Sequence, residues 1–346
     1  MSREETKENA MACRLSVIIP NRNGEDTIGL CLEALVRSDH ESFEIIVVDD
    51  CSTDTSVAII RQFPCKLIRL KEHVGTAVAR NIGAQSCSGA LLFFTDADCL
   101  VYKDTLFRAE RIAAASGPDT IIGGTYTCRP YDLTFYSMFQ SVFIHFFELK
   151  NIHHPDYIAA HAMVITSHTF RESGGFPIDF LPIIEDVEFS HRLRKKGYTL
   201  IMEPGLQVRH NFGYHRLSDS MKNGYNKSKY WTIYSLSNRD LLADSGTASL
   251  ELKTNVLVLF ATLALIAVYF VYPNVWFVFL LTGLIALNLL QSRRLFSLFL
   301  RSGGKNFLFK AAIYYMFVYP FAVGAGFLAG ILNVLTSPRS EANKQP

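Results

Sequence analysis

The 346-residue sequence has neither of the glycine-rich signatures by which phosphate-binding loops are most easily found. No G-x-G-x-x-G follows its first apolar run, and no G-x-x-x-x-G-K-S/T occurs. Their absence argues against a dinucleotide-binding fold and against a P-loop. A phosphate group bound by this chain would have to be held in another way, and a metal ion is the obvious means.

Paired cysteines are lacking as well. The seven cysteines are scattered, and none belongs to a C-x-x-C pair: Cys13, Cys31, Cys51, Cys65, Cys87, Cys99 and Cys128. An odd, scattered set indicates neither a disulfide framework nor a zinc knuckle, and it fits a reducing cytosol. Residues 1–8 contain no apolar stretch, so no signal peptide is expected. The formal net charge of +2 is too small to imply a nucleic-acid partner.

Toward the C-terminus, charge itself becomes scarce. Three runs carry no charged residue: 255–272, 275–290 and 311–335. The first two are shorter than the roughly 20 residues that a bilayer core requires, but the Pro273-Asn274 turn between them is typical of a helical hairpin. We expect three membrane crossings. Residues 295–300 could instead form an interfacial helix, and the third run could be re-entrant.

Basic residues gather between the second and third runs, whereas the turn between the first two runs has no charge. They are Arg293, Arg294, Arg301, Lys305 and Lys310. The positive-inside rule then places this connection, and with it the large N-terminal domain, in the cytoplasm. We therefore expect a multi-pass protein of the inner (cytoplasmic) cell membrane, with membrane lipids as partners near the basic residues.

The N-terminal part alternates between short apolar runs and helical patterns. The expected strands are 15–20, 43–48, 66–70 and 90–95. Strands that alternate with helices over short links predict an α/β fold with a mostly parallel, doubly wound sheet. Each strand ends in polar residues, so the loops that carry Asn21, Asp50 and Asp96 should meet at the carboxyl edge of the sheet.

An Asp-x-Asp triplet, Asp96 to Asp98, ends the fourth of these strands. Two carboxylates at this edge offer oxygen ligands to a hard divalent cation, which usually completes its shell with substrate phosphates. A nucleoside diphosphate is the ligand that this arrangement favours. Taken alone, the triplet also occurs in solvated turns.

Beyond Gly123 the pattern is less regular. The aromatic-rich segment 131–149 is expected to be a helix, either lying partly on a membrane or packed in a core. Further expected elements are strands at 157–166, 200–203 and 207–210, a turn at 174–176, and a helix at 184–196 that Gly197 ends.

Five stretches, in this order, resemble the motifs of the inverting family-2 glycosyltransferases of GT-A fold (nucleotide-diphospho-sugar transferase, Rossmann-like). They are 16–23, 44–54, 75–84, 96–98, and 174–176 followed by Glu185-Asp186. The resemblance covers roughly residues 15–210, and the family usually has glycine where Cys51 stands. The Q-x-x-R-W motif of processive members is missing, with Lys229-Tyr230-Trp231 as the nearest approach, so transfer of a single sugar is favoured.

The resemblance implies roles for residues that would bind the nucleotide sugar. Pro20 and Asn23 belong to the first nucleotide-binding stretch, Asp50 should hydrogen-bond the base, and Arg80 should reach the base or the diphosphate. A carboxylate acceptor suits the imide N–H of uracil, which favours a UDP-linked donor. Without their motifs, Asp50 would be interpreted as a turn residue and Arg80 as a surface arginine.

The resemblance also implies a metal site and a catalytic base. Asp98 should bind Mn²⁺ or Mg²⁺ directly, Asp96 should contact the ribose or bind the metal through water, and His210 matches a metal-facing histidine. Asp186 should take the proton from the acceptor hydroxyl. Asp186 could instead belong to a solvated helix N-terminus, and His210 could simply close a strand. The spacing of His153, His154 and His161 fits no zinc pattern.

Four regions follow from these patterns: a flexible N-terminus (1–13), a GT-A domain (14–245), an α-helical membrane region (246–336) and a tail (337–346). The expected function is a membrane-anchored, inverting transfer of one sugar to a hydroxyl of a lipid or cell-envelope glycan precursor. The oligomeric state is left open.

Three alternatives remain at this stage. A polyprenyl-phosphate glycosyltransferase would have a phosphate acceptor and would need less help from a base. A nucleotidyltransferase would need a further carboxylate and a basic template channel. A membrane-tethered, non-catalytic nucleotide-binding scaffold would have no use for Asp186.

Overall fold

The computed structural model describes residues 15–178 and 180–336, which divide into two compact units. The first unit comprises the chain up to Leu133 together with Glu148–Gly213, and the second comprises Thr134–Phe147 and the chain from Tyr214 onward. Residues 214–245, which we expected to be part of the α/β domain, therefore lie in the second unit. The predicted N-terminal stretch 1–13 and tail 337–346 fall outside the described residues.

The first unit is built on one mixed, mostly parallel sheet. Within the described residues its eight strands are β1 (Leu15–Asn21), β2 (Phe43–Asp49), β3 (Lys66–Arg69), β4 (Leu91–Phe94), β5 (Cys99–Val101), β6 (Thr120–Tyr126), β7 (Met163–Thr166) and β8 (Thr199–His210), in the order β3-β2-β1-β4-β7-β6-β8-β5. Strands β3, β2, β1 and β4 run parallel, as does the pair β6 and β8, whereas β7 and β5 are antiparallel to their neighbours. The predicted α/β class is confirmed.

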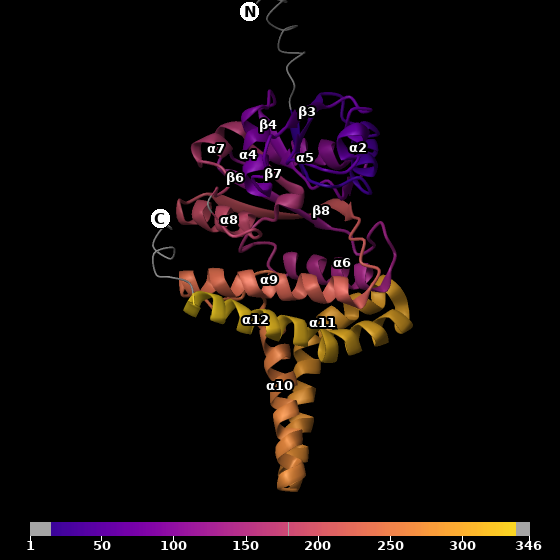
Figure 1. Ribbon diagram of the computed structural model, residues 1–346, viewed down its shortest axis with the longest axis vertical. Coiled ribbons are helices and arrows are strands. Elements are labelled where there is room, and N and C mark those ends of the chain that lie inside the picture. Colours follow the sequence, from indigo (N-terminus) through magenta and orange to yellow (C-terminus); the bar gives the residue numbers. More distant parts are fainter. Residues whose placement is uncertain (1–14, 179, 337–346) are drawn as a thin grey trace, which may run out of the picture. The chain divides into compact units, whose positions relative to one another are not determined.

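Helices follow the strands of this sheet (Figure 1). They are α2 (Ile28–Val36), α3 (Ser56–Ile60), α4 (Thr76–Gln85), α5 (Thr105–Ala115), α7 (Ser167–Glu172) and α8 (Glu185–Lys195). Helix α2 shows why these segments are helical: its buried residues Ile28, Cys31, Leu32 and Leu35 recur at helical spacing and form one apolar face. Burial of such faces on the sheet fixes where the strand ends, and hence the loops, must lie.

Two expected strand assignments were wrong. Residues 157–166 are not one strand, because the 3₁₀ turn Ala160–Ala162 precedes the short strand β7. The two expected strands at 200–203 and 207–210 are one strand, β8, which runs through Pro204. Its register against β6 shifts between Gly123 and Thr125, and such a bulge accommodates a proline that has no N–H to donate.

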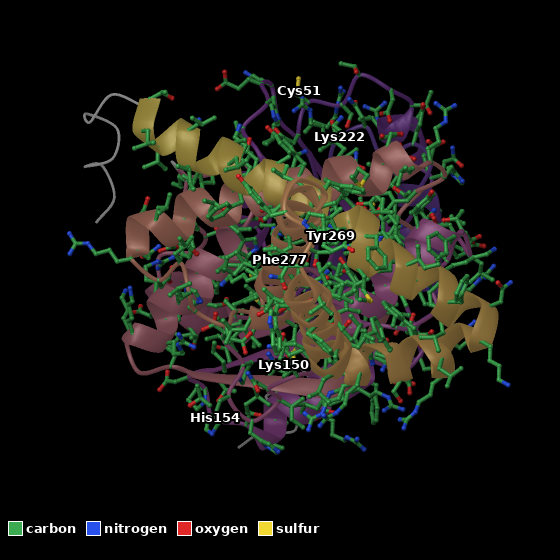
Figure 2. The ribbon with its side chains drawn as sticks, turned by 90° about the horizontal axis from the view of Figure 1, so that it is seen from below. Cys51, Lys150, His154, Lys222, Tyr269 and Phe277 are labelled. Atoms are coloured by element: carbon green, nitrogen blue, oxygen red, sulfur yellow. The ribbon has the colours of Figure 1, made fainter. Side chains whose placement is uncertain are left out.

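The second unit is helical. Its elements are α6 (Phe135–Glu148), α9 (Leu217–Asn238), α10 (Leu250–Val271), α11 (Val275–Ile313), a π-helical turn (Tyr314–Val318) and α12 (Tyr319–Thr336). Helix α10 and the first part of α11 form a hairpin that projects from the other helices of this unit (Figure 1). Figure 2 shows this hairpin end-on, with Tyr269 and Phe277 on its two arms.

Two stretches of the described residues are long and apolar enough to cross a membrane, Leu250–Val271 and Val275–Thr336. The hairpin carries large apolar side chains at its surface, such as Leu257 (70% exposed) and Phe270 (80% exposed). Exposure on this scale is unusual for a helix whose surroundings are water. The hairpin that we expected at 255–290 is therefore present as a structural element.

The third expected crossing, 311–335, has a different setting. It spans the end of α11, the π-helical turn and α12, and α12 lies along the polar helix α9 (Figure 1). The two helices meet at glycines, because a Cβ on Gly326 would lie 2.3 Å from the backbone oxygen of Tyr225 and a Cβ on Gly330 would lie 2.7 Å from that of Lys229. The number of crossings stays a prediction.

Buried polar side chains join the base of the hairpin to the π-helical turn. The Asn255 amide donates to the backbone oxygen of Tyr315 (2.7 Å), and the Asn288 amide donates to Asn255 Oδ1 (2.7 Å). A π-helical turn interrupts the regular hydrogen-bond ladder, so its carbonyl needs another donor. The asparagines supply it and hold α10, α11 and the turn together.

The aromatic segment expected at 131–149 is helix α6, and it is a core helix. Phe139, Phe143 and Phe147 are buried, and the rings of Phe139 and Phe143 lie 5.5 and 5.7 Å from that of Tyr319 on α12. Rings at these distances pack edge-to-face. Of the two interpretations of this segment, the packed core helix is the one that the structure supports.

Candidate functional site

The loops after β1 and β2 are tied together at the carboxyl edge of the sheet. Asn23 lies two residues after the end of β1 and has a left-handed backbone conformation (φ 50°). Its side chain accepts a hydrogen bond from the backbone N–H of Thr53 (2.8 Å). Asn21 donates to Asp49 Oδ1 (3.1 Å). Pro20 lies within β1. The first two predicted nucleotide-binding stretches therefore form one edge.

Asp50 is 3% exposed and orders the loop that leads into α4. Its carboxylate accepts from the backbone N–H groups of Val74 (2.8 Å) and Gly75 (2.9 Å), and His73 Nδ1 lies 2.7 Å from Oδ2. Gly75 has a φ of 91°, which a side chain would strain. A carboxylate has about four acceptor positions, so Asp50 retains room for one more donor.

Arg80 is not a surface residue. It extends from α4, is 4% exposed, and donates to Asp96 Oδ1 (2.5 Å) and to Glu185 Oε1. Its guanidinium lies over the ring of Phe176, 5.7 Å from the centroid. Arg80 thus joins the loop after β4 to the first residue of α8, and as the residues lie it is committed to these carboxylates.

The next residue, Asn81, makes a second link between the same elements. Its amide donates to the backbone oxygen of Phe176 (2.8 Å) and accepts from the Phe176 N–H (2.9 Å). Gly175 lies so close that a Cβ there would be 2.6 Å from Asn81 Oδ1, and its φ is 72°. The glycine pair before Phe176 therefore lets the 174–176 turn dock on α4.

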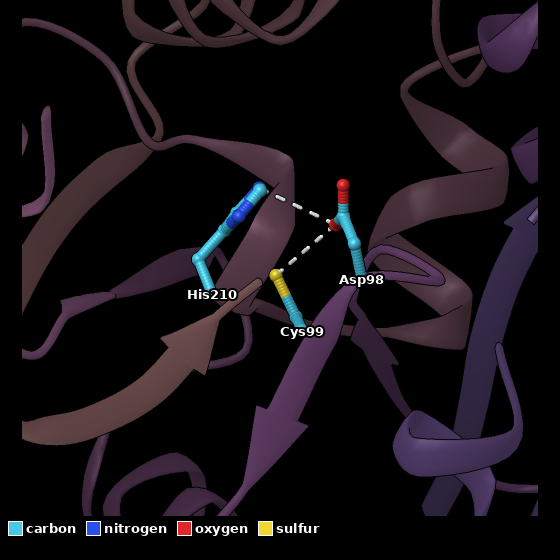
Figure 3. Close-up of side chains that lie close together, drawn as sticks. All are labelled: Asp98, Cys99 and His210. Atoms are coloured by element: carbon cyan, nitrogen blue, oxygen red, sulfur yellow. Dashed lines mark hydrogen bonds and ion pairs between the residues drawn. The ribbon is translucent and has the colours of Figure 1, made fainter. Parts of the chain in front are cut away.

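Asp98 directly precedes β5, His210 is the last residue of β8, and their side chains face each other (Figure 3). His210 Nε2 lies 3.3 Å from Asp98 Oδ1, and the Cys99 thiol lies 3.7 Å from the same oxygen. Burial and neighbouring Asp98 raise the pKa of Cys99 well above its usual value, so its sulfur stays a thiol. Burial, with Asp96 adding to it and His210 opposing it, also raises the pKa of Asp98.

These residues fit a divalent cation. Two ligand atoms, each about 2.1 to 2.2 Å from one cation and at right angles, are about 3 Å apart, and Asp98 Oδ1 and His210 Nε2 lie at 3.3 Å. A carboxylate with an imidazole suits Mn²⁺, whereas Mg²⁺ prefers oxygen alone. The raised pKa of Asp98 marks a carboxylate whose charge lacks compensation, and a cation would supply it.

Asp96 differs from Asp98 because it already has a cationic partner. Burial acts to raise its pKa, but Arg80, together with His161 and His210, outweighs this effect, and the pKa lies below its usual value. Its side chain is 29% exposed, compared with 38% for that of Asp98. Asp96 is therefore ionised and held in place beside the Asp98–His210 pair.

Asp186 lies at the start of α8. Its Oδ2 accepts from the backbone N–H of Ala160 (3.0 Å), which fixes the carboxylate. Burial and the neighbouring Glu185 raise its pKa to about 6, although Arg80 acts in the opposite direction. The residue before α8, Ile184, has a φ of 67°, a strained conformation for a β-branched side chain. A carboxylate that titrates near neutrality suits a general base.

Sequence patterns did not predict the set of packed rings next to His210. The Tyr126 ring stacks on His161 with centroids 3.9 Å apart and meets the His210 ring edge-on at 4.8 Å. Glu148 lies behind them, with Oε2 3.6 Å from His161 Nε2 and accepting from Thr125 (2.7 Å). These residues hold His210 in place. Only Asn81 among the missed residues had a sequence signal, since it adjoins Arg80 in its motif.

All the predicted site residues lie in the first unit, at or near the carboxyl edge of its sheet. Contacts join Asp96, Arg80 and the α8 start that carries Asp186, and they separately join Asp98 to His210. Asp50 and Asn23 organise loops of the same edge. None of the described contacts brings Asp186 against Asp98.

Comparison with known proteins agrees with this geometry. The model of a family described as Glycosyl transferase family 2 matches residues 16–172, which contain β1 to β7 and the Asp-x-Asp triplet. Glycosyltransferase AglE of Haloferax volcanii is 28% identical over 193 residues, which are 54% of this chain and 63% of AglE.

Two further relatives extend the comparison. Poly(ribitol-phosphate) beta-N-acetylglucosaminyltransferase TarS of Staphylococcus aureus is 33% identical over 116 residues, or 32% of this chain and 20% of TarS. The solved structure of mannosyltransferase PcManGT from Pyrobaculum calidifontis, in complex with GDP-Man and Mn²⁺, aligns with a TM-score of 0.56 and 17% identity over 93% of this chain and 87% of that chain. The chain thus spans less than two thirds of these curated relatives, and PcManGT shares its fold.

Proposed function

The chain carries a domain of glycosyl transferase family 2, and from this premise we propose that it transfers a single sugar from a nucleotide sugar to a hydroxyl acceptor with inversion. The acceptor that we propose is a lipid or a cell-envelope glycan precursor. TarS, by its name, acts on poly(ribitol phosphate), and the proposal extends this class of acceptor to the present chain.

One observation supports the proposal most directly. At the carboxyl edge of the sheet, the Asp98–His210 pair lies beside Asp96, and Arg80 joins Asp96 to the helix start that carries Asp186. A cation site beside a carboxylate of raised pKa is what transfer from a nucleoside diphosphate to a hydroxyl needs. A domain that only bound a nucleotide would have no use for Asp186.

In this proposal Asp98 and His210 would hold Mn²⁺ or Mg²⁺, which would supply charge compensation for the leaving diphosphate. Asp186 takes the proton from the acceptor hydroxyl as its oxygen bonds to the anomeric carbon. The bond from that carbon to the diphosphate oxygen breaks, and the nucleoside diphosphate leaves with the electron pair. Attack opposite the leaving group inverts the anomeric centre.

We propose uracil as the base, because Asp50 keeps an acceptor position next to the ordered loop 73–75. Asn23 and Pro20 would border the same nucleotide. PcManGT was solved with GDP-Man, so guanine is the competing base that an experiment has to include.

We also propose that the protein is an integral protein of the cell membrane with its α/β unit in the cytoplasm. The exposed apolar hairpin of α10 and α11 supports insertion, and the basic residues of α11 after the hairpin support this orientation. This placement would bring the site to a lipid acceptor from the cytoplasmic side.

A binding experiment tests the donor site. The full chain, purified in detergent, would be titrated calorimetrically with UDP and with GDP, each with and without Mn²⁺. We expect UDP to bind only with Mn²⁺, and Asp98→Ala to abolish binding. Replacement of the exposed Asp39 by alanine is the matched control and should leave binding unchanged. If folded protein binds neither nucleotide, the transferase proposal is wrong.

The apolar hairpin also favours a second candidate, a polyprenyl-phosphate glycosyltransferase. Its phosphate acceptor is already ionised and needs no base. Asp186→Asn should therefore lower transfer to a hydroxyl by about 10²- to 10⁴-fold but should weaken transfer to polyprenyl phosphate much less. Release of pyrophosphate instead of a nucleoside diphosphate would indicate nucleotidyl transfer.

A further inference from the structure

The helical unit contains a cavity of about 260 Å³ that is separate from the candidate active site. It lies among α6, α9, α10 and α12, and all of its lining residues belong to this unit. Large apolar side chains make up most of its wall: Phe143, Trp231, Leu252, Tyr319, Val323 and Phe327. Pockets for small molecules usually measure about 300 to 1,000 Å³, so this one suits a single narrow chain.

One buried polar side chain stands out in the wall. Gln140 on α6 is 1% exposed, and neither Nε2 nor Oε1 of its amide has a hydrogen-bond partner within residues 15–178 and 180–336. A buried amide without partners is destabilising, because it loses its hydrogen bonds to water and gains none in return. Glutamine at this position is therefore unfavourable unless something that enters the cavity bonds to it.

Water is a poor candidate for that role. A buried water usually needs two to four polar partners. Two hydroxyls of the wall have their protons engaged elsewhere, because Ser228 donates to the backbone oxygen of Val323 (2.7 Å) and Thr232 donates to that of Ser228 (2.7 Å). Gln140 supplies a buried amide, which can both donate and accept, in a wall made mostly of apolar side chains.

Two of the exposed lining residues are apolar, although Lys227 and Lys253 also line the cavity. Leu242 and Leu257, which line the cavity, are 81% and 70% exposed. Leu257 lies on α10, one arm of the hairpin that is long and apolar enough to cross a membrane. A ligand that enters here would come from apolar surroundings and not from water.

We propose that this cavity is a binding site for one alkyl or prenyl chain of a lipid, and that Gln140 hydrogen-bonds the ester or phosphate-ester oxygen at the head of that chain. The proposal does not depend on the transferase activity. Its failure and the failure of the donor-site experiment are therefore distinguishable.

The chain contains its own reporter for this site. Of its two tryptophans, Trp231 lines the cavity and is 8% exposed, whereas Trp276 at the start of α11 is 72% exposed. In a Trp276→Phe background, fluorescence comes from Trp231 alone. Brominated lipids quench tryptophan on contact, so phosphatidylcholine brominated on its acyl chains would be titrated into the full chain in detergent. We expect saturable quenching.

Two variants and a control locate the binding. Ala248→Phe fills the cavity from its loop and should weaken the quencher's affinity at least tenfold. Gln140→Leu should lower the preference for brominated phosphatidylcholine over a brominated alkane about tenfold, because it removes one hydrogen bond in an apolar site. Gln291→Leu, the same change at an exposed position of α11, should have no effect.

The source of the chain follows from competition. If unlabelled polyprenyl phosphate displaces the quencher at a lower concentration than phosphatidylglycerol does, the site binds the acceptor type of lipid. If phosphatidylglycerol is the stronger competitor, the site binds a bilayer lipid. Either result supports the site. Three results would overturn the proposal. They are quenching that does not saturate, a quencher that neither lipid displaces, and quenching that is the same in Ala248→Phe and Gln140→Leu as in the parent.

Discussion

Asp96 and Asp98 are two residues apart, yet their surroundings differ in kind. Asp96 lies 2.5 Å from the buried guanidinium of Arg80, and its pKa is below the usual value. Asp98 lies 3.3 Å from a histidine and 3.7 Å from the Cys99 thiol, is more exposed, and has a raised pKa. One carboxylate is compensated by the protein itself, and the other lacks such compensation.

The difference separates a fixed side of the site from an open side. On the fixed side, Arg80 and Asn81 of α4 hold the loop after β4, the turn 174–176 and the start of α8 at Glu185 in place. On the open side, Asp98 and His210 carry an oxygen and a nitrogen atom that can bind a cation, and Asp98 keeps a raised pKa. In the proposed function, a metal with its diphosphate would bind on the open side, and Asp186, the proposed base, would be positioned by the fixed side.

Removal of Arg80 should break the fixed side. Arg80→Ala would leave Asp96 and Glu185 without their cation, and the loss of one partner from a buried ion pair costs about 3 to 5 kcal/mol of unfolding free energy. Denaturant unfolding followed by circular dichroism would measure this. Arg108→Ala breaks an exposed pair with Asp104 and should cost less than about 0.5 kcal/mol. Equal losses in the two variants would refute the assignment of Arg80 as the compensating charge.

The pH dependence of the rate should report Asp186. Because only the ionised carboxylate accepts a proton, the rate should level off above pH 6 and fall about tenfold per pH unit below that value. Single-turnover rates between pH 5 and 8 would measure this. A profile without a fall near pH 6 would mean that another group is the base.

The raised pKa of Asp186 also predicts that this side chain lowers the stability of the fold at neutral pH. The pKa of Asp186 is raised from 3.8 to about 6 in the folded protein, so its ionisation destabilises the fold as pH rises through this range. At pH 7, Asp186→Asn should therefore be more stable than the parent, by up to about 3 kcal/mol, and at pH 4, close to the unfolded-state pKa, the gain should fall below about 1 kcal/mol. The difference in unfolding midpoint at the two pH values measures it.

Loss of Asn81 should loosen the fixed side without changing its charge. Asn81→Ala leaves the N–H and C=O of Phe176 without partners, which should cost about 2 kcal/mol. Hydrogen exchange should then be faster over residues 174–178 while it is unchanged in β2. Gln62→Ala, which removes an exposed amide from the same unit, is the control. Unchanged exchange after Asn81→Ala would show that the turn is held by other contacts.

The sequence predicts most of what local patterns determine. The strands from β1 to β4 and the helices between them lie close to their expected positions, because each is an apolar run that ends in a loop. Strand β8 was divided in error because Pro204 is a local signal for a break, whereas the bulge opposite β6 that tolerates it depends on a partner far away in the chain. Helix α6 joins the helical unit through Phe139 and Tyr319, a contact that no local pattern predicts.

In the site, too, local motifs can be found in the sequence, whereas contacts between distant residues cannot. The loop that carries Asp96 lies at the expected edge of the sheet, but the partners of Arg80 lie 16 and 105 residues away, and their pairing exists only in the folded chain. The resemblance implied that Arg80 reaches the base or the diphosphate, which stays a prediction, and it did not indicate the pairing with Asp96 and Glu185. Burial, which also depends on the folded chain, is the main cause that raises the pKa of Asp98.

The smallest expected effect concerns Cys51, where the chain departs from the glycine that is usual in its family. The structure explains the preference, since Cys51 has a φ of 61° in the loop after β2. A side chain in this conformation costs about 1 to 2 kcal/mol, part of which the greater freedom of unfolded glycine offsets. Cys51→Gly should therefore raise the unfolding free energy by up to about 1 kcal/mol, whereas Cys51→Ala, which removes the thiol but keeps the strain, should not. If both substitutions stabilise the protein equally, the thiol is the source of the strain. The backbone of Cys51 is then less strained than its φ of 61° indicates.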